Sequence, residues 1–286
     1  MKREIIYLSA MLFTCLFFTS CKKEDAGTGL KAVFSYVADG YKVNFTNFSS
    51  NATEYLWDFG DGSGVTSTAK APQHIFTSKG DFLVSLTAKN GAESNTFIDT
   101  VSITGPNIKI DGDFSDWQYV SYTHENAESY GGTLLAVKTF ASSQEINFLL
   151  EGTSGMNMEI IDMYIDADNK PATGFNTWMF PSGSGADFLC EGSPVGGWGD
   201  VFAHAGSDPT AFSWSSVNSF GGAMAFSAIN TINGRKIIEF SIKKNALGTP
   251  KNFINFALVE STSGWAEVGQ IPEAKTPDSK FIAVPL

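Results

Sequence analysis

The segment YLWDFGDG, residues 55–62, decides the fold expected for the first part of the chain. Tyr55, Trp57 and Phe59 alternate with other residues, and this period of two is typical of a strand with one buried face. The Asp-Gly pair that ends the segment predicts a tight turn, because glycine reaches positive φ at no steric cost. Similar alternation at residues 82–88 indicates another strand. The spacing of such runs predicts about seven short strands in an antiparallel sandwich of immunoglobulin type.

Two further segments, PQHIF at residues 72–76 and GDFLVSL at 80–86, followed by Asn90, complete a pattern that resembles the PKD domain over residues 32–104. One departure is Phe76, where that family often has tyrosine, so a hydroxyl is lost while the ring is kept. The resemblance implies an immunoglobulin-like sandwich that serves as a spacer or an interaction module.

The polar residues of this first domain are expected to support the fold. Asp58 and Asp61 suit turns in which a carboxylate accepts hydrogen bonds from nearby backbone amides. His74 is expected to make a structural hydrogen bond, and Trp57 to lie in the core.

The chain begins with a segment that is typical of exported proteins. Lys2 and Arg3 precede an apolar stretch and small residues, which predicts a signal peptide over residues 1–20. With Cys21 next, the segment resembles a bacterial lipobox, which implies that Cys21 is lipidated after cleavage. An ordinary signal peptide and a retained membrane helix are the alternatives, although the stretch is short for a span of about 20 residues.

The residues after Cys21 are charged and rich in glycine. KKED at residues 22–25 resembles the export signal of Bacteroidetes lipoproteins, which implies a position on the outer face of the outer membrane. The alternative is the charged start of a linker. Residues 21–31 as a whole are predicted to form the acylated cysteine and a flexible tether.

Composition restricts the partners and the covalent links. The 286 residues carry a formal net charge of −11, so a nucleic acid would be repelled. Of the three cysteines, Cys15 leaves with the leader and Cys21 would carry lipid, which leaves Cys190 with no partner for an intramolecular disulfide.

A second β-rich domain is predicted over residues 107–286, after the Gly-Pro pair at 105–106. Its long loops are rich in glycine, serine and tryptophan, and its helix candidate is a short turn near residues 244–247. The architecture expected is a larger sandwich or jelly roll. Its strands are predicted at residues 134–140, 145–150, 160–165, 226–229, 236–242 and 253–259.

Three groups of residues in this domain resemble family 9 carbohydrate-binding modules. IDGDFSDW at 110–117 is similar to the first strand, IDADNKPATG at 165–174 with GADF at 185–188 to the central acidic loop, and IEFSI at 238–242 with NALG at 245–248 to the penultimate strand. Residues 177–219, expected to be the loops that contact the sugar, match no part of that pattern. The resemblance implies a β-sandwich that binds a glycan.

The acidic loop offers ligands for a cation. Asp166, Asp168 and Asn169 place oxygen atoms close together in a turn, and Asp187 and Glu191 are expected to return from the next strand. Calcium binds six to eight such oxygens, and a cation would relieve the repulsion between the carboxylates. We therefore expect structural Ca²⁺ here, with a solvated turn as the alternative.

Tryptophans in the loops are the candidate ligand contacts, because sugar rings stack their apolar faces on flat side chains. For each, a lid over the core is the alternative. The segment GGWG at 196–199 is the preferred candidate, since glycines let a ligand approach closely. Trp117 lies inside the segment that resembles the first strand, and it is expected to be buried. The four candidates are Trp178, Trp198, Trp214 and Trp265.

The sequence contains no recognisable catalytic motif. His74, His124 and His204 are not at metal-ligand spacing, no nucleophile elbow is present, and Cys190 has no motif around it. We therefore expect a surface lipoprotein that binds a glycan or polysaccharide without catalysis, with the PKD domain as spacer. The alternative is a structural or adhesive protein whose partners are proteins, including outer-membrane transport proteins. A polysaccharide hydrolase is the third possibility, since two catalytic carboxylates can be remote in sequence.

Overall fold

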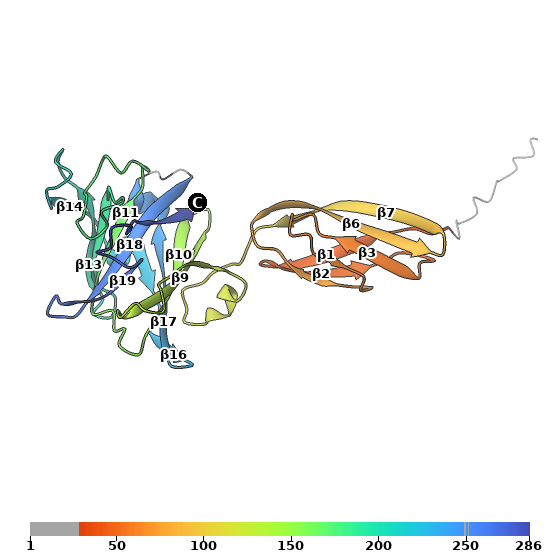
Figure 1. The fold of residues 1–286 in the computed structure, drawn as a ribbon, viewed down its shortest axis with the longest axis horizontal. Coiled ribbons are helices and arrows are strands. Elements are labelled where there is room, and N and C mark those ends of the chain that lie inside the picture. The colour runs from red at the N-terminus through yellow and green to blue at the C-terminus, as the bar shows by residue number, and fades with distance from the viewer. Residues whose placement is uncertain (1–28, 249, 251) are drawn as a thin grey trace, which may run out of the picture.

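A computed structural model describes residues 29–248, 250 and 252–286. The predicted signal peptide, Cys21 and most of the predicted tether lie outside the described residues. Within the described part, no helix is long and apolar enough to cross a membrane. Figure 1 shows two β-rich units arranged end to end.

The first unit is a sandwich of a three-stranded and a four-stranded sheet, with strand orders β1-β2-β5 and β4-β3-β6-β7. All pairings are antiparallel, as the immunoglobulin-type prediction requires. The strands are β1 Phe34–Asp39, β2 Lys42–Asn47, β3 Glu54–Asp58, β4 Thr66–Ser67, β5 Gln73–Ile75, β6 Gly80–Asn90 and β7 Glu93–Ile103.

The decisive segment behaves as its pattern predicts. Trp57 is fully buried, and its indole Nε1 donates to the Ala69 carbonyl at 2.9 Å. Asp58 accepts from the amide of Gly60 at 3.0 Å, and Asp61 from that of Ser63 at 3.0 Å. These carboxylates therefore hold turns, as expected.

His74 is also part of the fold. Its Nε2 lies 2.7 Å from a carboxylate oxygen of Asp61, and its ring stacks on Phe59 with the centroids 3.9 Å apart. The contact between His74 and Asp61 holds the loop that follows β3 against the strand β5.

The second unit consists of two antiparallel sheets, as the larger sandwich predicted for this region requires. One has six strands, in the order β15-β17-β10-β9-β8 with β16 beside β17, and the other has seven, in the order β14-β13-β12-β11-β18-β19 with β20 beside β18. The six-stranded sheet contains β8 Tyr122–Glu125, β9 Leu134–Ala141, β10 Glu145–Gly152, β15 Met224–Phe226, β16 Asn230–Ile232 and β17 Arg235–Lys243. The seven-stranded sheet contains β11 Ile160–Asp166, β12 Phe188–Ser193, β13 Trp198–His204, β14 Trp214–Ser219, β18 Phe253–Ser261, β19 Glu267–Ile271 and β20 Ile282–Pro285.

The structure differs from the sequence prediction in several places. Residues 110–117, which resemble a first strand, contain no strand, and the strands β8, β16, β19 and β20 were not predicted. Residues 177–219, expected as loops, contain the strands β12, β13 and β14. The strand expected at 226–229 ends at Phe226 as β15. Besides the predicted short helix, found as the 3-10 turn η2 Lys244–Leu247, there are η1 Phe114–Trp117 and the one-turn α1 Phe220–Ala223.

The inner faces of the two sheets form the main core. Phe148 on β10, Phe240 on β17 and Phe256 on β18 meet there, and all three are at least 99% buried. The opposite face of the seven-stranded sheet is partly covered by loops that bring Phe175, Met179, Phe180 and Phe281 onto Tyr164 and Leu189. We call this opposite face the outer face.

The two units are joined by apolar and polar contacts. Tyr41 of the first unit packs edge-on against Phe140 of the second, with ring centroids 6.3 Å apart. The Lys79 Nζ donates to the Ala141 carbonyl at 2.8 Å. Gly105 lies so close to Phe140 that a Cβ would be 2.6 Å from the ring. In Figure 1 the six-stranded sheet is on the side of this joint, and the seven-stranded sheet lies farther from it.

Candidate functional site

Acidic side chains form a row across the outer face of the seven-stranded sheet. Asp162 on β11 lies opposite Glu191 on β12, and Glu191 lies opposite Asp200 on β13. Their chain neighbours point into the main core, so these carboxyl groups point outward, because side chains alternate along a strand. At about 4.8 Å between strands, the row is about 10 Å long. We call these three residues the acidic row.

Asp162 is the most perturbed member of the row. Burial raises its pKa to about 7, and the charge and hydrogen bond of Glu191 add to the effect, as does the charge of Glu267. Among the described residues, the buried Oδ1 atom of Asp162 has no hydrogen-bond partner. The row therefore has an unused acceptor.

Trp198 lies beside the row. It precedes Asp200 by two residues on β13, so both side chains belong to the outer face. The Trp198 side chain is exposed, at 52%. Gly196 and Gly197 form the preceding turn, and a Cβ on Gly196 would come within 3.0 Å of the Trp198 ring. The glycine-rich turn thus allows the ring to fold over it.

Trp178 is connected to the same face through Lys275. The Lys275 Nζ lies 4.9 Å from the centroid of the Trp178 ring and 2.5 Å from a Glu267 carboxylate oxygen. Glu267 is close enough for its charge to raise the pKa of Asp162. Trp178 is 68% exposed. Trp198 therefore lies beside the acidic row, whereas Trp178 is linked to the row through Lys275 and Glu267.

The other two candidate tryptophans lie in different settings. Trp265 is exposed in the turn between β18 and β19, where its φ is 63°. Trp214 is half-buried and packs edge-on against Phe175 and Phe212, in the position of a lid over the core. Trp117 is buried, as expected, and its indole Nε1 donates to Glu239 at 2.9 Å.

A carboxylate group lies at one end of the sheet, where the loop between β11 and β12 begins and ends. Oxygens of Asp166, Asp168 and Asp187 all lie within 4.8 Å of one another. Asn169 is adjacent, since its backbone N–H donates to Asp166 Oδ1 at 2.7 Å. Glu191 is placed elsewhere: it lies four residues beyond Asp187 on β12, in the acidic row.

The chemistry of this carboxylate group fits a hard cation. Asp166 is fully buried, and burial raises its pKa, with the charge of Asp168 adding to the effect. Burial likewise raises the pKa of Asp187, which accepts hydrogen bonds from the amides of Ala167 and Asp168. The three carboxylates offer hard oxygen ligands whose negative charge is little neutralised by neighbouring groups. Ca²⁺ binds such oxygens, and carbonyl groups and water complete its coordination shell.

An open pocket of about 800 Å³ adjoins the carboxylate group. Asp168 and Asp187 contribute to its lining, together with Phe188, His204 and Phe253. It combines apolar walls with oxygen ligands at one side.

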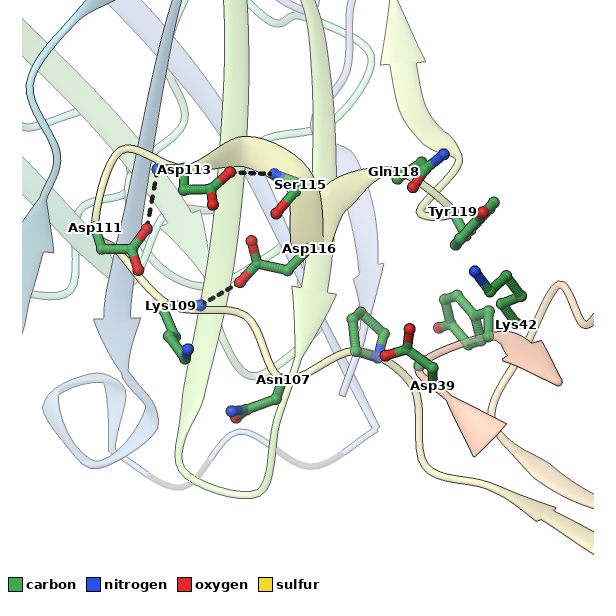
Figure 2. Close-up of a pocket in the computed structure, with 13 residues that line it drawn as sticks. Asp39, Lys42, Asn107, Lys109, Asp111, Asp113, Ser115, Asp116, Gln118 and Tyr119 are labelled. Atoms are coloured by element: carbon green, nitrogen blue, oxygen red, sulfur yellow. Dashed lines mark hydrogen bonds between the residues drawn. The ribbon is translucent and has the colours of Figure 1, made fainter. Parts of the chain in front are cut away.

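A second pocket, of about 400 Å³, lies at the joint between the units, as Figure 2 shows. Three of its four carboxylates accept hydrogen bonds from the backbone: Asp111 from the amide of Asp113, Asp113 from that of Ser115, and Asp116 from that of Lys109. They stabilise the turn that begins the second unit.

Sequence reasoning missed the acidic row. Asp162 interrupts the apolar run IIDMYID, which is a usable signal, but its partner Glu191 is identified only by the pairing of β11 with β12. Lys275 and Glu267 come from a later part of the chain and have no local pattern.

Comparison with known proteins identifies the first unit. A model of the PKD domain matches residues 29–103. The pre-pro-metalloprotease PrtV of Vibrio cholerae serotype O1 (strain M66-2) is 37% identical over 81 residues, which are 27% of this chain and 9% of PrtV. The same protein of strain ATCC 39315 matches equally. The chain thus spans about 9% of the length of the curated relatives it matches.

Two solved structures are similar to parts of the chain. The crystal structure of the PKD1 domain from PrtV is 35% identical and has a TM-score of 0.24, covering 26% of this chain and 95% of that one. A structure described as a carbohydrate-binding module of the β-sandwich superfamily is 17% identical, with a TM-score of 0.23, and covers 75% of this chain and 91% of that one. From the family match and the architecture together, the chain contains a PKD domain, which is followed by a larger β-sandwich.

Proposed function

We propose that the second domain binds a glycan without catalysis, on the outer face of its seven-stranded sheet. The observation that carries this proposal is the exposed indole ring of Trp198 beside the acidic row. A second exposed ring, that of Trp178, is linked to the row through Lys275 and Glu267. Indole rings stack on the apolar faces of sugars, and carboxylates accept hydrogen bonds from sugar hydroxyls. The PKD domain would act as a spacer on the opposite side of the sandwich.

Calcium is part of the proposal. Asp166, Asp168 and Asp187 would hold the ion, with Asn169 beside them. The ion would neutralise the carboxylates and fix both ends of the loop between β11 and β12. This loop carries Trp178, so the ion would also position one of the two rings.

The spacing of Asp162 and Glu191 does not suit a glycosidase pair. Glycosidases hold their two carboxyl groups about 5–9.5 Å apart, with the scissile bond between them. Asp162 and Glu191 are instead close enough to share a hydrogen bond, which leaves no space for a sugar between them.

A second candidate function has support on the PKD domain. Leu83 on β6 and Ile98 on β7 are 66% and 59% exposed and lie near each other on the same face. Exposed apolar side chains on a sheet suit a protein partner. Crosslinking in intact cells, with Leu83→Ser/Ile98→Ser as the variant, tests this: a crosslinked protein lost in that variant would support it.

We also propose that lipid at Cys21 anchors the protein on the outer face of the outer membrane. Cys21→Ser should release the protein from the membrane fraction, and protease added to intact cells should cleave the native protein. Native protein that stays soluble, or that resists protease until the cells are lysed, would contradict the anchor or its orientation.

A glycan array tests the central proposal. The native protein should bind at least one glycan, and Trp178→Ala and Trp198→Ala should each weaken that binding at least tenfold. Phe48→Ala is the control, because Phe48 is 62% exposed but lies in the PKD domain. Loss of binding in the control alone, or no binding to any glycan, would refute the proposal.

A further inference from the structure

The carboxyl groups of the acidic row lack a cationic partner. Among the described residues, none of the salt bridges involves Asp162, Glu191 or Asp200. Asp200 accepts a hydrogen bond from the Ser216 hydroxyl at 3.2 Å, and the Oδ1 of Asp162 has no partner. Like charges that face each other across neighbouring strands destabilise a sheet, so the row has an unmet need for positive charge or for hydrogen-bond donors.

The nearby lysine does not meet this need. The Lys275 ammonium is 2.5 Å from Glu267, which is itself acidic, so this pair leaves the charge of the row unchanged. Even with a proton on Asp162, the carboxyl groups of Glu191, Asp200 and Glu267 outnumber the one ammonium, so this part of the face keeps a negative balance. An ionised carboxylate only accepts hydrogen bonds, so a complementary ligand must donate them.

Lys275 shows how an ammonium group is held on this face. Its Nζ lies over the Trp178 ring and against the carboxylate of Glu267 at the same time. A cation is attracted both to the face of an indole and to a carboxylate. Trp198, two residues from Asp200 on the same face, offers the same two elements, and among the described residues no lysine or arginine lies over its ring.

We propose that the outer face recognises a glycan that carries free amino groups, with a sugar ammonium held between the Trp198 ring and the carboxyl groups of Glu191 and Asp200. This inference rests on the proposed glycan-binding function of the same face and narrows its ligand class. A sugar with carboxylate or sulfate groups would meet the same row with repulsion. A neutral sugar would stack on the rings but leave the negative charge unpaired.

Three oligosaccharides with one backbone test the inference. Chitosan, chitin and cellulose hexamers are all β-1,4-linked and differ at one carbon, which carries an ammonium, an acetamide or a hydroxyl group. Calorimetric titration at mildly acidic pH should show the chitosan hexamer binding at least tenfold more tightly than the other two. Its affinity should also fall as salt is added, because an exposed charge interaction is screened.

Variants of the row provide the second readout. Glu191→Gln and Asp200→Asn keep the side-chain size and should remove most of the preference for the chitosan hexamer, with little effect on the cellulose hexamer. Asp99→Asn is the control, because Asp99 is exposed on the PKD domain. A thermal melt first shows whether each variant is folded. If a variant has lost its cooperative transition, the native protein is instead titrated with the chitosan hexamer at increasing salt concentrations.

The outcomes separate the two proposals. Equal or tighter binding of the cellulose or chitin hexamer, or of polygalacturonate, overturns the amino-sugar inference but leaves glycan binding in place. A salt-independent preference for chitosan also overturns it. If the protein binds none of these and no glycan on an array, the proposed function itself fails.

Discussion

The two domains use the same residue types in opposite ways. In the PKD domain, Trp57 is fully buried with its indole nitrogen bonded, and Asp58 and Asp61 accept hydrogen bonds from turn amides. In the second domain, Trp198 is exposed and Asp162 faces another carboxyl group with one oxygen unpartnered. In the PKD domain the bonding capacity of these residues is used inside the chain, whereas in the second domain an exposed indole ring and an unpartnered carboxyl oxygen remain.

The largest expected effect lies on the structural side of this comparison. Trp57→Ala should lower the free energy of unfolding of the PKD domain by about 3–5 kcal/mol, because it leaves a large cavity in a fully buried site. Urea denaturation measures this change. A loss below about 1 kcal/mol would show that Trp57 is not a core residue.

The pH dependence of stability tests the acidic row. Because the pKa of Asp162 is raised to about 7 in the fold, the folded state binds an extra proton between the unfolded pKa and this value. The contribution of Asp162 to the free energy of unfolding should therefore be most favourable below about pH 4. It should become less favourable by about 2–4 kcal/mol as the pH rises to about 7.

Asp162→Asn removes that titration. The melting temperature of the variant minus that of the native protein should therefore be larger at pH 8 than at pH 5. Parallel melting curves of the two proteins across this range would contradict the assignment.

Calcium should have an effect of intermediate size. At a free concentration of about 100 times Kd, an ion bound by the native state alone adds about 2.7 kcal/mol. The melting temperature should rise with calcium and fall with a chelator, and Asp187→Asn should suppress the difference. Identical melting curves with calcium and with the chelator would remove the ion from this account.

The smallest stability change is expected on the outer face of the seven-stranded sheet. Trp198→Ala should alter the free energy of unfolding by less than about 0.5 kcal/mol, because the ring is 52% exposed and packs little. The same urea denaturation that is used for Trp57→Ala measures it. A loss as large as that of Trp57→Ala would place Trp198 in the core and end its role as a ligand platform.

The PKD domain was predictable because its determinants are local. Alternating aromatics and an Asp-Gly turn specify strands within a few residues, and β3 and β6 appear where the pattern requires. The strands β12 to β14 were missed because their glycine and serine content is typical of loops, although pairing with β11 stabilises them in the sheet.

The candidate site was predictable only in part. The turn at Asp166, Asp168 and Asn169 and the return of Asp187 are close in sequence, and the structure brings them together. Glu191 was grouped with them by sequence proximity, but four residues along a strand correspond to about 13 Å, which moves it opposite Asp162. Strand register, which no local pattern reports, defines the acidic row.

The indole signals of the tryptophans provide the most direct test that exposed residues of the second domain bind ligand while buried ones hold the fold. Nitrogen–proton NMR spectra are recorded while a glycan that the protein binds is added to saturation. Each indole signal is assigned by substituting the corresponding tryptophan. The account predicts that the signals of Trp178 and Trp198 shift while those of Trp57 and Trp117 stay in place. Unchanged Trp178 and Trp198 signals at saturation, with shifts confined to other residues, would contradict it.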